Sequence, residues 1–466
     1  MPPAAVLLSR ASGAGRTPAP VRIIHMGLGN FFRAHQAWYT DRAPDAAEWG
    51  IAAFTGRSAT MAQALEPQDG LYTLITRAAD GDSFDVISSV STVHAASDHA
   101  AWLSYWRDDN VALVTLTITE AGYLRAEDGH LDMTREDVQS DVAALRADSK
   151  AAVSTAPGRI VAGYLARRDA GAGSLAVLPC DNLPHNGPAL RMVLTDLIDA
   201  VDPSLADWAE QHVAFGTTMV DRITPATTDE HRALVLAATG RVDSAPVPTE
   251  PFSEWVIQGE FPHGRPAWDA VGARVVADVE PFEQRKLWLL NGSHSLLAYA
   301  GPILGHETVA DAISDPVLRT WVEQWWDEAC RHLSLSDSEV ADYRVALIDR
   351  YQNPAIRHVL AQIAVDGSQK LPVRILPTLR AERAAGRVPL ASARVLAAWV
   401  CHLRGLGAPV RDAGAAQLVG KATGSLDDAV DVTIAFLDKE LTGDAVVRDA
   451  VLAQARDIDS RFRTAG

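Results

Sequence analysis

The chain has 466 residues, of which 48% are hydrophobic and 22% charged, close to the average soluble globular protein. This length predicts two or three domains, and the composition excludes wholesale disorder. Asp and Glu number 59 against 42 Lys and Arg, and the formal charge of −17 opposes binding to nucleic acid or to anionic membranes. The three cysteines lie too far apart for a C-x-x-C pair. We therefore expect no disulfide framework, no structural zinc and a cytoplasmic location.

Strand and helix signals alternate over the first 282 residues. Residues 1–20, rich in Ala, Pro and Gly, predict a flexible N-terminal arm. Residues 21–26 read as a strand that ends at Gly27-Leu28-Gly29, and residues 30–39 have helical spacing. Further strands are expected at residues 49–54, 71–76, 84–93, 111–118 and 175–178. These signals predict an α/β fold with a doubly wound domain over residues 21–282.

The pattern changes after residue 282. Long apolar repeats of helical period follow one another, separated by Pro/Gly turns, and few strand signals remain. The repeats cover residues 286–299, 317–333, 390–403 and 426–441. We therefore expect a mainly α-helical C-terminal domain over residues 283–466.

Gly27-Leu28-Gly29 lies between a strand and a helix and is a candidate dinucleotide-binding loop. The first glycine permits the tight turn, and the second lets the backbone approach a pyrophosphate. The third glycine of G-x-G-x-x-G falls at Phe32, so an ordinary glycine turn stays an alternative. After the second strand, Thr55-Gly56-Arg57-Ser58 replaces the acid that binds an adenosine ribose. Arg57 could accommodate a 2′-phosphate, which leaves NAD and NADP both open.

Residues 283–294 concentrate the polar groups of the helical half. At about 100° per residue, Glu283, Lys286, Asn291 and His294 would fall within roughly 140° on an unbroken helix. A buried lysine can lose its proton near neutral pH and act as a general base toward an alcohol, while an asparagine can stabilise a developing alkoxide. The alternative is a helix at a domain boundary, with the lysine in a salt bridge and the histidine in the core.

Five segments, in order along the chain, resemble the mannitol dehydrogenase family of polyol-specific long-chain dehydrogenases. They are residues 24–37 (IHMGLGNFFRAHQA), 180–187 (CDNLPHNG), 219–225 (MVDRITP), 286–294 (KLWLLNGSH) and 366–372 (DGSQKLP). The resemblance implies a Rossmann-type N-terminal domain followed by a mainly α-helical C-terminal domain. It also implies a secondary-alcohol dehydrogenase that uses a nicotinamide coenzyme and no metal, with its site in the cleft between the domains.

The resemblance further implies roles for individual residues. Lys286 is the expected general base, Asn291 and Asn182 polarise the substrate oxygen, His294 orients substrate and lysine, and Glu283 exchanges protons with solvent. Substrate contacts are expected from Asp221, Arg222, Gln362 and Lys370. Coenzyme contacts are expected from Gly27, Leu28, Gly29, Asn30, Phe31 and Arg57.

Two positions depart from the family pattern. Phe32 replaces a histidine common in the opening motif, and Gln362 replaces an arginine typical of mannitol dehydrogenases. Gln362 together with residues 366–370 looks more like the fructuronate reductase branch, which acts on sugar acids. Lys370 or Arg374 could supply the cation that a carboxylate substrate needs. The alternative is that both cap a helix and meet only solvent.

We therefore expect an oxidoreductase that interconverts a linear polyol and its 2-ketose, with mannitol and fructose as the type pair. NAD is slightly favoured over NADP. A fructuronate reductase acting on D-mannonate is the close alternative, and a catalytically silent nucleotide or sugar sensor is the alternative from another class. Nothing in the sequence indicates a coiled-coil seam, and we expect a monomer.

Overall fold

The protein divides into two compact units, residues 1–279 (the N-unit) and residues 280–466 (the C-unit). This computed structural model describes residues 6–465, with side chains up to residue 463. The domain boundary that we expect after residue 282 lies close to this division. Among the described helices, none combines the length and the apolar character that crossing a membrane requires.

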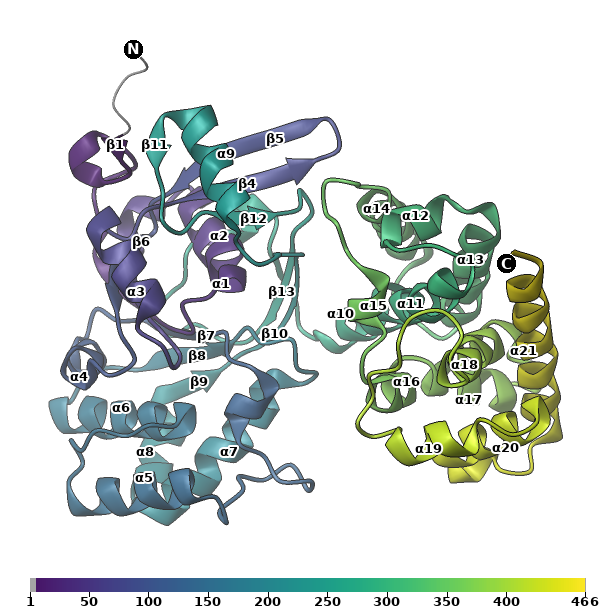
Figure 1. The fold of residues 1–466 in the computed structure, drawn as a ribbon. Helices are drawn as coiled ribbons and strands as arrows, with labels where there is room; N and C mark the ends of the chain where they lie inside the picture. The colour runs from purple at the N-terminus through teal and green to yellow at the C-terminus, as the bar shows by residue number, and fades with distance from the viewer. Residues whose placement is uncertain (1–5, 466) are drawn as a thin grey trace. The chain divides into compact units, whose positions relative to one another are not determined.

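The N-unit is built on a six-stranded sheet in which every neighbouring pair is parallel (Figure 1). Its strands, in spatial order, are β6 (Val90–His94), β3 (Gly50–Phe54), β2 (Val21–Met26), β7 (Leu113–Leu116), β8 (Leu175–Pro179) and β9 (Val213–Phe215). The chain moves outward from β2 to one edge and then returns to β7 to build the other half. This reversal confirms the doubly wound topology and places the ligand-binding crevice at the carboxyl ends of β2 and β7.

Both faces of the sheet are covered. Ile23 and Ile24 alternate between two buried clusters, because successive strand residues point to opposite faces. Trp102 and Ile160 pack on one face, and Phe32 packs on the other. The helices of the N-unit are α1 (Asn30–Ala34), α2 (Gln36–Arg42), α3 (Thr60–Leu65), α4 (His99–Arg107), α5 (Glu136–Ala147), α6 (Ala156–Ala170), α7 (Asn186–Val201), α8 (Leu205–His212) and α9 (Asp229–Thr239).

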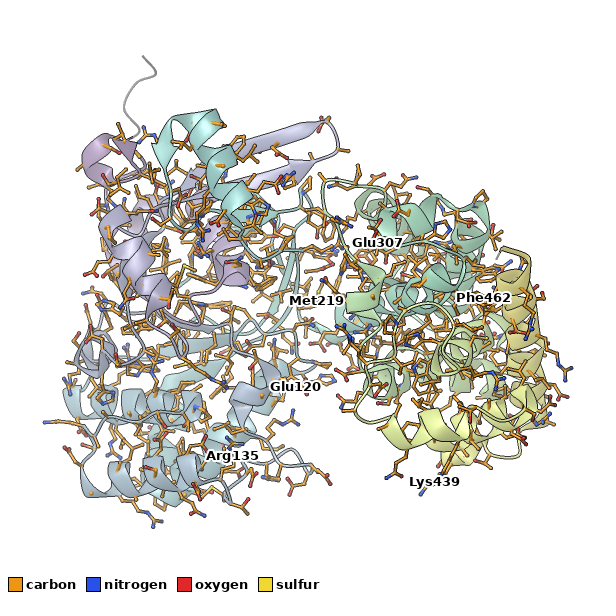
Figure 2. The ribbon with its side chains drawn as sticks, viewed as in Figure 1. Glu120, Arg135, Met219, Glu307, Lys439 and Phe462 are labelled. Atoms are coloured by element: carbon orange, nitrogen blue, oxygen red, sulfur yellow. The ribbon has the colours of Figure 1, made fainter. Side chains whose placement is uncertain are left out.

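Three smaller sheets complete the N-unit. Of the strand expected over residues 84–93, one part pairs antiparallel with β4, while residues 90–94 instead join the main sheet beside β3. Met219, labelled in Figure 2, is buried on a strand that the sequence did not reveal. The strands are β4 (Tyr72–Ala78) with β5 (Gly81–Ile87) and β12 (Val247–Thr249), β10 (Thr217–Asp221) with β13 (Glu254–Gln258) and β14 (Arg274–Val275), and β1 (Val6–Leu7) with β11 (Arg241–Val242).

Residues 6–20 are packed against the N-unit, which differs from the free arm that their composition predicts. Leu8 is fully buried in a small cluster with Leu71. Arg10 donates hydrogen bonds to the backbone oxygens of Ser88 (3.1 Å) and Val90 (3.0 Å). These contacts hold the segment although it contains few regular elements. Residues 1–5 of the expected arm lie outside the described residues.

The regular elements of the C-unit are all helices in its described part, apart from one isolated bridge between Thr308 and Val359. Helix α18 coincides with the predicted repeat over residues 390–403 and is almost wholly buried. The helices are α10 (Glu280–Arg285), a π-helix (Lys286–Gly292), α11 (Ser293–Ile303), α12 (Val309–Ser314), α13 (Pro316–Cys330), α14 (Asp337–Tyr351), α15 (Leu360–Ile363), α16 (Gly367–Arg374), α17 (Leu376–Ala384), α18 (Leu390–Leu403), α19 (Ala416–Lys421), α20 (Leu426–Leu437) and α21 (Ala445–Ala465). The mainly helical character of this half is confirmed.

Candidate functional site

The loop after β2 needs its first glycine for the fold and leaves space at its second. Gly27 has φ +112°, and a Cβ atom there would collide with the backbone oxygen of Thr117. A Cβ atom on Gly29 would meet nothing closer than the Gly27 oxygen at 3.7 Å. The absence of a side chain at Gly29 is therefore not required by packing. It fits instead a backbone that a pyrophosphate approaches closely.

An aromatic stack replaces the third glycine of the fingerprint. The Phe32 ring lies parallel to His25, with 3.5 Å between ring centroids. His25 contacts Thr115 Oγ1 (2.8 Å) and Thr117 Oγ1 (3.0 Å), and burial lowers the pKa of His25 to about 3. A neutral, fully bonded imidazole thus packs helix α1 onto the sheet, where a glycine would allow closer contact in the full motif.

A cavity of about 820 Å³ lies at the carboxyl ends of β2, β3 and β7. Of the predicted coenzyme residues, Gly27 and Arg57 line it, together with Arg135 and Arg159. This is the topological switch point, where doubly wound sheets bind dinucleotides. The cavity and the glycine loop therefore fit a nicotinamide dinucleotide.

The other predicted coenzyme residues hold the loop from inside. Leu28 is buried. The Asn30 amide donates to the Pro225 oxygen (3.0 Å), and Phe31 stacks on His35 at 5.0 Å. These contacts shape the turn rather than the cavity wall.

Asp181, two residues after the end of β8, is a functional candidate that the sequence reasoning missed. It accepts hydrogen bonds from the Tyr123 hydroxyl (2.5 Å) and from the Ile118 backbone N–H. Burial raises the pKa of Asp181 to about 7. The carboxyl group thus ties the segment after β7 to the segment after β8. Asn182, the next residue along the chain, is exposed. An acid two residues after a fully buried, apolar strand is the signal that could have revealed it.

Asp221 is the last residue of strand β10 and Arg222 follows it, and both are buried. The Arg222 guanidinium donates to the backbone oxygens of Ala34 and Glu250 and lies over the Trp38 ring, 4.6 Å from its centroid. Burial lowers its pKa to about 10. Arg222 therefore fastens the end of α1 within the N-unit, and the substrate contact that the family resemblance implies for it stays a prediction.

In the C-unit, the predicted polar face does not lie on one regular helix. Glu283 belongs to α10, Lys286 and Asn291 belong to a π-helix, and His294 belongs to α11. A π-helix bonds i to i+5, so its turn is wider than an α-helical one and the angular spacing calculated for an unbroken α-helix does not apply. Single π turns are frequent at functional sites.

Donors from helix α13 fix the π-helix. Trp325 Nε1 donates to the Trp288 oxygen (2.8 Å), and Trp326 Nε1 donates to the Leu289 oxygen (3.0 Å). A Cβ atom on Gly292 would lie 2.7 Å from the Trp325 ring, so only glycine fits there. The segment that carries Lys286 is thus held in part through its backbone, by two indole donors from α13.

His294 follows the π-helix as a buried, neutral ring. Its centroid lies 5.0 Å from those of Tyr351 and His358. Burial lowers the pKa of His294 well below its usual range, and the positive charge of Arg350 and Arg374 adds to this. Its Nε2 atom has no hydrogen-bond partner among the described residues. An uncharged imidazole with an unpartnered ring nitrogen is suited to orient a hydroxyl group.

Two cations adjoin this segment in different ways. Arg374 donates to the Asn291 oxygen (3.3 Å) and the Ser295 hydroxyl (3.2 Å). Lys370 donates to the oxygens of Ile363 (3.1 Å) and Val365, and burial, with the charge of Arg374, lowers the pKa of Lys370. The predicted Gln362 is exposed on α15, next to the loop that Lys370 holds.

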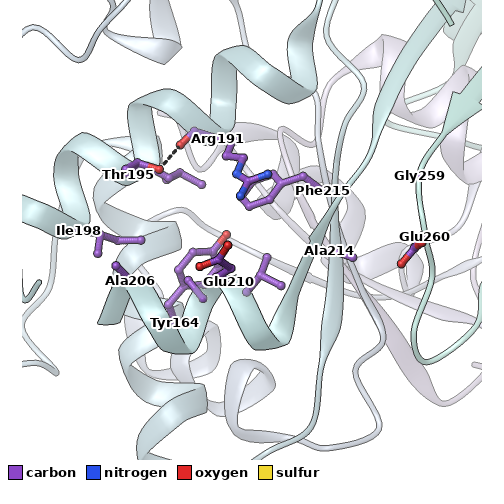
Figure 3. A pocket seen from close by; sticks show the side chains of 13 residues that line it. Tyr164, Arg191, Thr195, Ile198, Ala206, Glu210, Ala214, Phe215, Gly259 and Glu260 are labelled. Atoms are coloured by element: carbon purple, nitrogen blue, oxygen red, sulfur yellow. Dashed lines mark hydrogen bonds between the residues drawn. The ribbon is translucent and has the colours of Figure 1, made fainter. Parts of the chain in front are cut away.

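A second cavity, of about 430 Å³, lies beside the edge strand β9 (Figure 3). Tyr164, Arg191, Glu210 and Phe215 are among its lining side chains, and none of the predicted site residues takes part. Within residues 6–465, no three His, Cys, Asp or Glu side chains converge as metal ligands would.

Family models cover both units. The mannitol dehydrogenase Rossmann domain matches residues 21–270, and the mannitol dehydrogenase C-terminal domain matches residues 278–452. The chain belongs to the mannitol dehydrogenase family. It is therefore an oxidoreductase, and the resemblance seen in its five motifs is confirmed.

Relatives of the mannitol dehydrogenase family carry different substrate names. D-mannonate oxidoreductase of Escherichia coli (strain K12) is 37% identical, over 83% of this chain and 80% of that protein. D-arabinitol 4-dehydrogenase of Ralstonia nicotianae is 36% identical, over 94% and 95%. A structure of Pseudomonas fluorescens mannitol 2-dehydrogenase with NAD and D-mannitol is similar with a TM-score of 0.78 and 31% identity, covering 99% of this chain and 96% of that one.

Proposed function

We propose that the protein is a nicotinamide-dependent dehydrogenase that interconverts a linear polyol and its 2-ketose. Family membership and the names of the relatives support this reaction class. The observation that carries the proposal is the pinned π-helix, which presents Lys286 and Asn291 immediately before the buried, neutral His294. The cavity at the switch point supplies the space for the coenzyme.

In this proposal Lys286 takes the proton of the substrate hydroxyl on its Nζ atom. A nicotinamide coenzyme, when bound, accepts the hydride that leaves the carbinol carbon. The Asn291 amide, which has no hydrogen-bond partner in the described part of the chain, donates to the oxygen as its double bond to carbon forms. His294 holds a hydroxyl through its free ring nitrogen, and Glu283 passes the proton of Lys286 to solvent.

The N-unit contributes to the same proposal. The family resemblance pairs Asn182 with Asn291 in polarising the substrate oxygen. It also implies that Asp221 contacts the substrate. Asp181 acts as a positioning residue for Asn182, because its two hydrogen bonds fix the end of β8. Gly27 and Gly29 shape the coenzyme loop. The cytoplasmic location and the monomeric state stay predictions from the sequence.

A sugar acid is the second candidate substrate. Arg374 contacts the backbone of Asn291, and among the described residues it forms no ion pair with a carboxylate. A cation at this position suits a substrate carboxylate. The relative named D-mannonate oxidoreductase favours the same alternative.

A panel of polyols and aldonates, assayed at the reduced-nicotinamide absorbance with both coenzymes, tests the proposal. Turnover of mannitol, arabinitol or sorbitol with a higher specificity constant than mannonate supports the polyol assignment. A higher constant for mannonate, lost selectively in Arg374→Met and retained in Arg374→Lys, supports the sugar acid. No turnover with any member of the panel contradicts the dehydrogenase and favours a sensor.

A further inference from the structure

Arg159 is a buried cation that the mechanism above does not use. It lies in the first turn of α6 and is 3% exposed. Its guanidinium stacks over the Trp102 ring, 4.5 Å from the centroid, and Nη1 makes a long contact with the Thr55 oxygen (3.5 Å). Its Nη2 atom has no hydrogen-bond partner among the described residues.

No carboxylate compensates this charge. Among the described residues Arg159 forms no ion pair, and burial lowers the pKa of its guanidinium to about 10. A buried charge without a partner is costly, so such groups are normally paired or face a ligand. Arg159 is one of the residues that line the cavity at the carboxyl ends of β2, β3 and β7, so a ligand bound in the cavity would lie beside this residue.

The cavity around Arg159 is positively charged. Arg57, Arg135 and Arg159 line it, and Asp137 is the one acidic lining residue. Asp137 already accepts hydrogen bonds from Nε (2.9 Å) and Nη2 (2.8 Å) of Arg135, the residue labelled in Figure 2. The remaining charge therefore belongs to Arg57 and Arg159. Residues 154–156 at the start of helix α6 also line the cavity, but there the carboxylate of Asp141 already accepts from the backbone N–H groups of Ser154 and Thr155 (2.9 Å each).

The position of Arg57 and Arg159 in the fold indicates which part of a bound dinucleotide they would contact. Thr55 follows β3, the second strand of the doubly wound sheet, whose carboxyl end lies beside the adenosine ribose of a bound dinucleotide. An acid there bonds the ribose 2′-hydroxyl, whereas a cation accommodates a 2′-phosphate. From residue 55 to residue 65 the chain has no Asp or Glu.

We propose that Arg159, together with Arg57, binds the 2′-phosphate of the coenzyme, so that the protein selects NADP over NAD. This inference rests on the proposed dehydrogenase function and names the coenzyme that it uses. Arg57 approaches from the exposed loop after β3, and Arg159 from the buried start of α6. The phosphate supplies the counter-charge that Arg159 lacks in the protein alone.

Binding of coenzyme fragments tests the proposal without turnover. Adenosine 2′,5′-bisphosphate and adenosine 5′-monophosphate are titrated into the full-length protein by calorimetry. We expect the bisphosphate to bind roughly 10- to 100-fold more tightly, the size of one or two charge-assisted hydrogen bonds in a partly desolvated site, and the difference to shrink at high salt. Equal affinities for the two fragments overturn the proposal.

Variants assign the effect to residues. Arg159→Met should remove most of the preference for the bisphosphate and leave the monophosphate affinity unchanged. Because the substitution removes an uncompensated buried charge, the melting temperature should not fall. Arg57→Ala, an exposed change, should lower the preference independently. A preference that survives in both variants overturns the assignment.

Arg167→Met is the matched control. Arg167 lies on the same helix and is fully buried, but its donors already meet the oxygens of Gly173, Trp106 and Val111. Its loss should lower the melting temperature without changing the preference between fragments. Turnover distinguishes failure of the phosphate site from failure of the proposed function. Equal activity with NAD and NADP contradicts only the 2′-phosphate site. No activity with either coenzyme contradicts the proposed dehydrogenase function.

Discussion

Gly292→Ala tests whether the π-helix depends on its contact with Trp325. The added Cβ atom would lie 2.7 Å from Cζ2 and Nε1 of the indole and 2.9 Å from Cε2. Carbon atoms in contact lie about 3.5 Å apart or more, so the ring must move by roughly 0.8 Å. Trp325 is fully buried, and its Nε1 donates at 2.8 Å to the Trp288 oxygen. The move therefore disturbs both the packing and this hydrogen bond.

The expected cost follows from these two contributions. Overpacking a well-filled core costs about 1–3 kcal/mol, and a lost hydrogen bond about 1 kcal/mol. The better helix propensity of alanine returns up to about 1 kcal/mol. Gly292→Ala should thus lower the free energy of unfolding of the C-unit by about 1–3 kcal/mol. Because Lys286 and Asn291 lie on the same π-helix, kcat should fall at least about tenfold.

Urea unfolding followed by tryptophan fluorescence, and steady-state turnover, measure the two effects. Gly420→Ala is the control, because it lies exposed in α19 with nothing within 4 Å of its Cβ position, and it should stabilise slightly. Trp325→Phe, which shortens the ring, should relieve most of the clash in a double variant. Wild-type stability and turnover in Gly292→Ala would refute the reasoning.

Three further predictions concern the coenzyme loop and two carboxyl groups. Gly29→Ala should fold as the wild type does, since the added Cβ atom would meet only the Gly27 oxygen, at 3.7 Å. It should bind the coenzyme at least about tenfold more weakly, measured by calorimetry, because the Cβ atom would occupy the space through which the pyrophosphate approaches the backbone. Because burial raises the pKa of Asp181 from 3.8 to about 7, the free energy of unfolding should fall by up to about 4 kcal/mol between pH 4 and pH 7; Asp181→Asn should abolish this slope in urea titrations. Burial alone would raise the pKa of Glu382, but hydrogen bonds from Arg387 and His332 lower it to about 2, so stability present above pH 4.5 should be lost as the pH falls toward 2. Glu382→Gln should cost about 2 kcal/mol at pH 7 and nothing near pH 2, and equal costs at both pH values would count against a stabilising role of the bonds from Arg387 and His332.

Local patterns were enough to predict the elements whose burial follows from their own residues. The apolar run around β7 and the repeat that forms α18 are examples, because each consists of residues that can only be buried. The glycine turn after β2 was also recognisable, since Gly27 occupies a backbone conformation that other residues rarely adopt. The doubly wound order followed from the alternation of such elements.

The geometry of the candidate site depends on partners that lie far along the chain. The π-helix is fixed by indole donors that come 37 residues later, so a helical wheel drawn on residues 283–294 alone could not show it. The substrate contact expected of Arg222 came from the family resemblance, and its backbone partners, Ala34 and Glu250, lie in segments far away in the sequence and could not be predicted from the motif. That Arg159 lines a cavity with the loop after β3 likewise becomes visible only when α6 and β3 are placed together.

The central claim is that the amine of Lys286 accepts the alcohol proton, and turnover of the Lys286 variants tests it most directly. Lys286→Ala should lower kcat by roughly 10²- to 10⁴-fold with the best substrate of the panel, and Lys286→Arg, which keeps the charge but cannot act as a base, should lose as much. Both variants should bind the coenzyme fragments as the wild type does. Turnover near the wild-type rate in either variant, with the protein folded, would contradict the account.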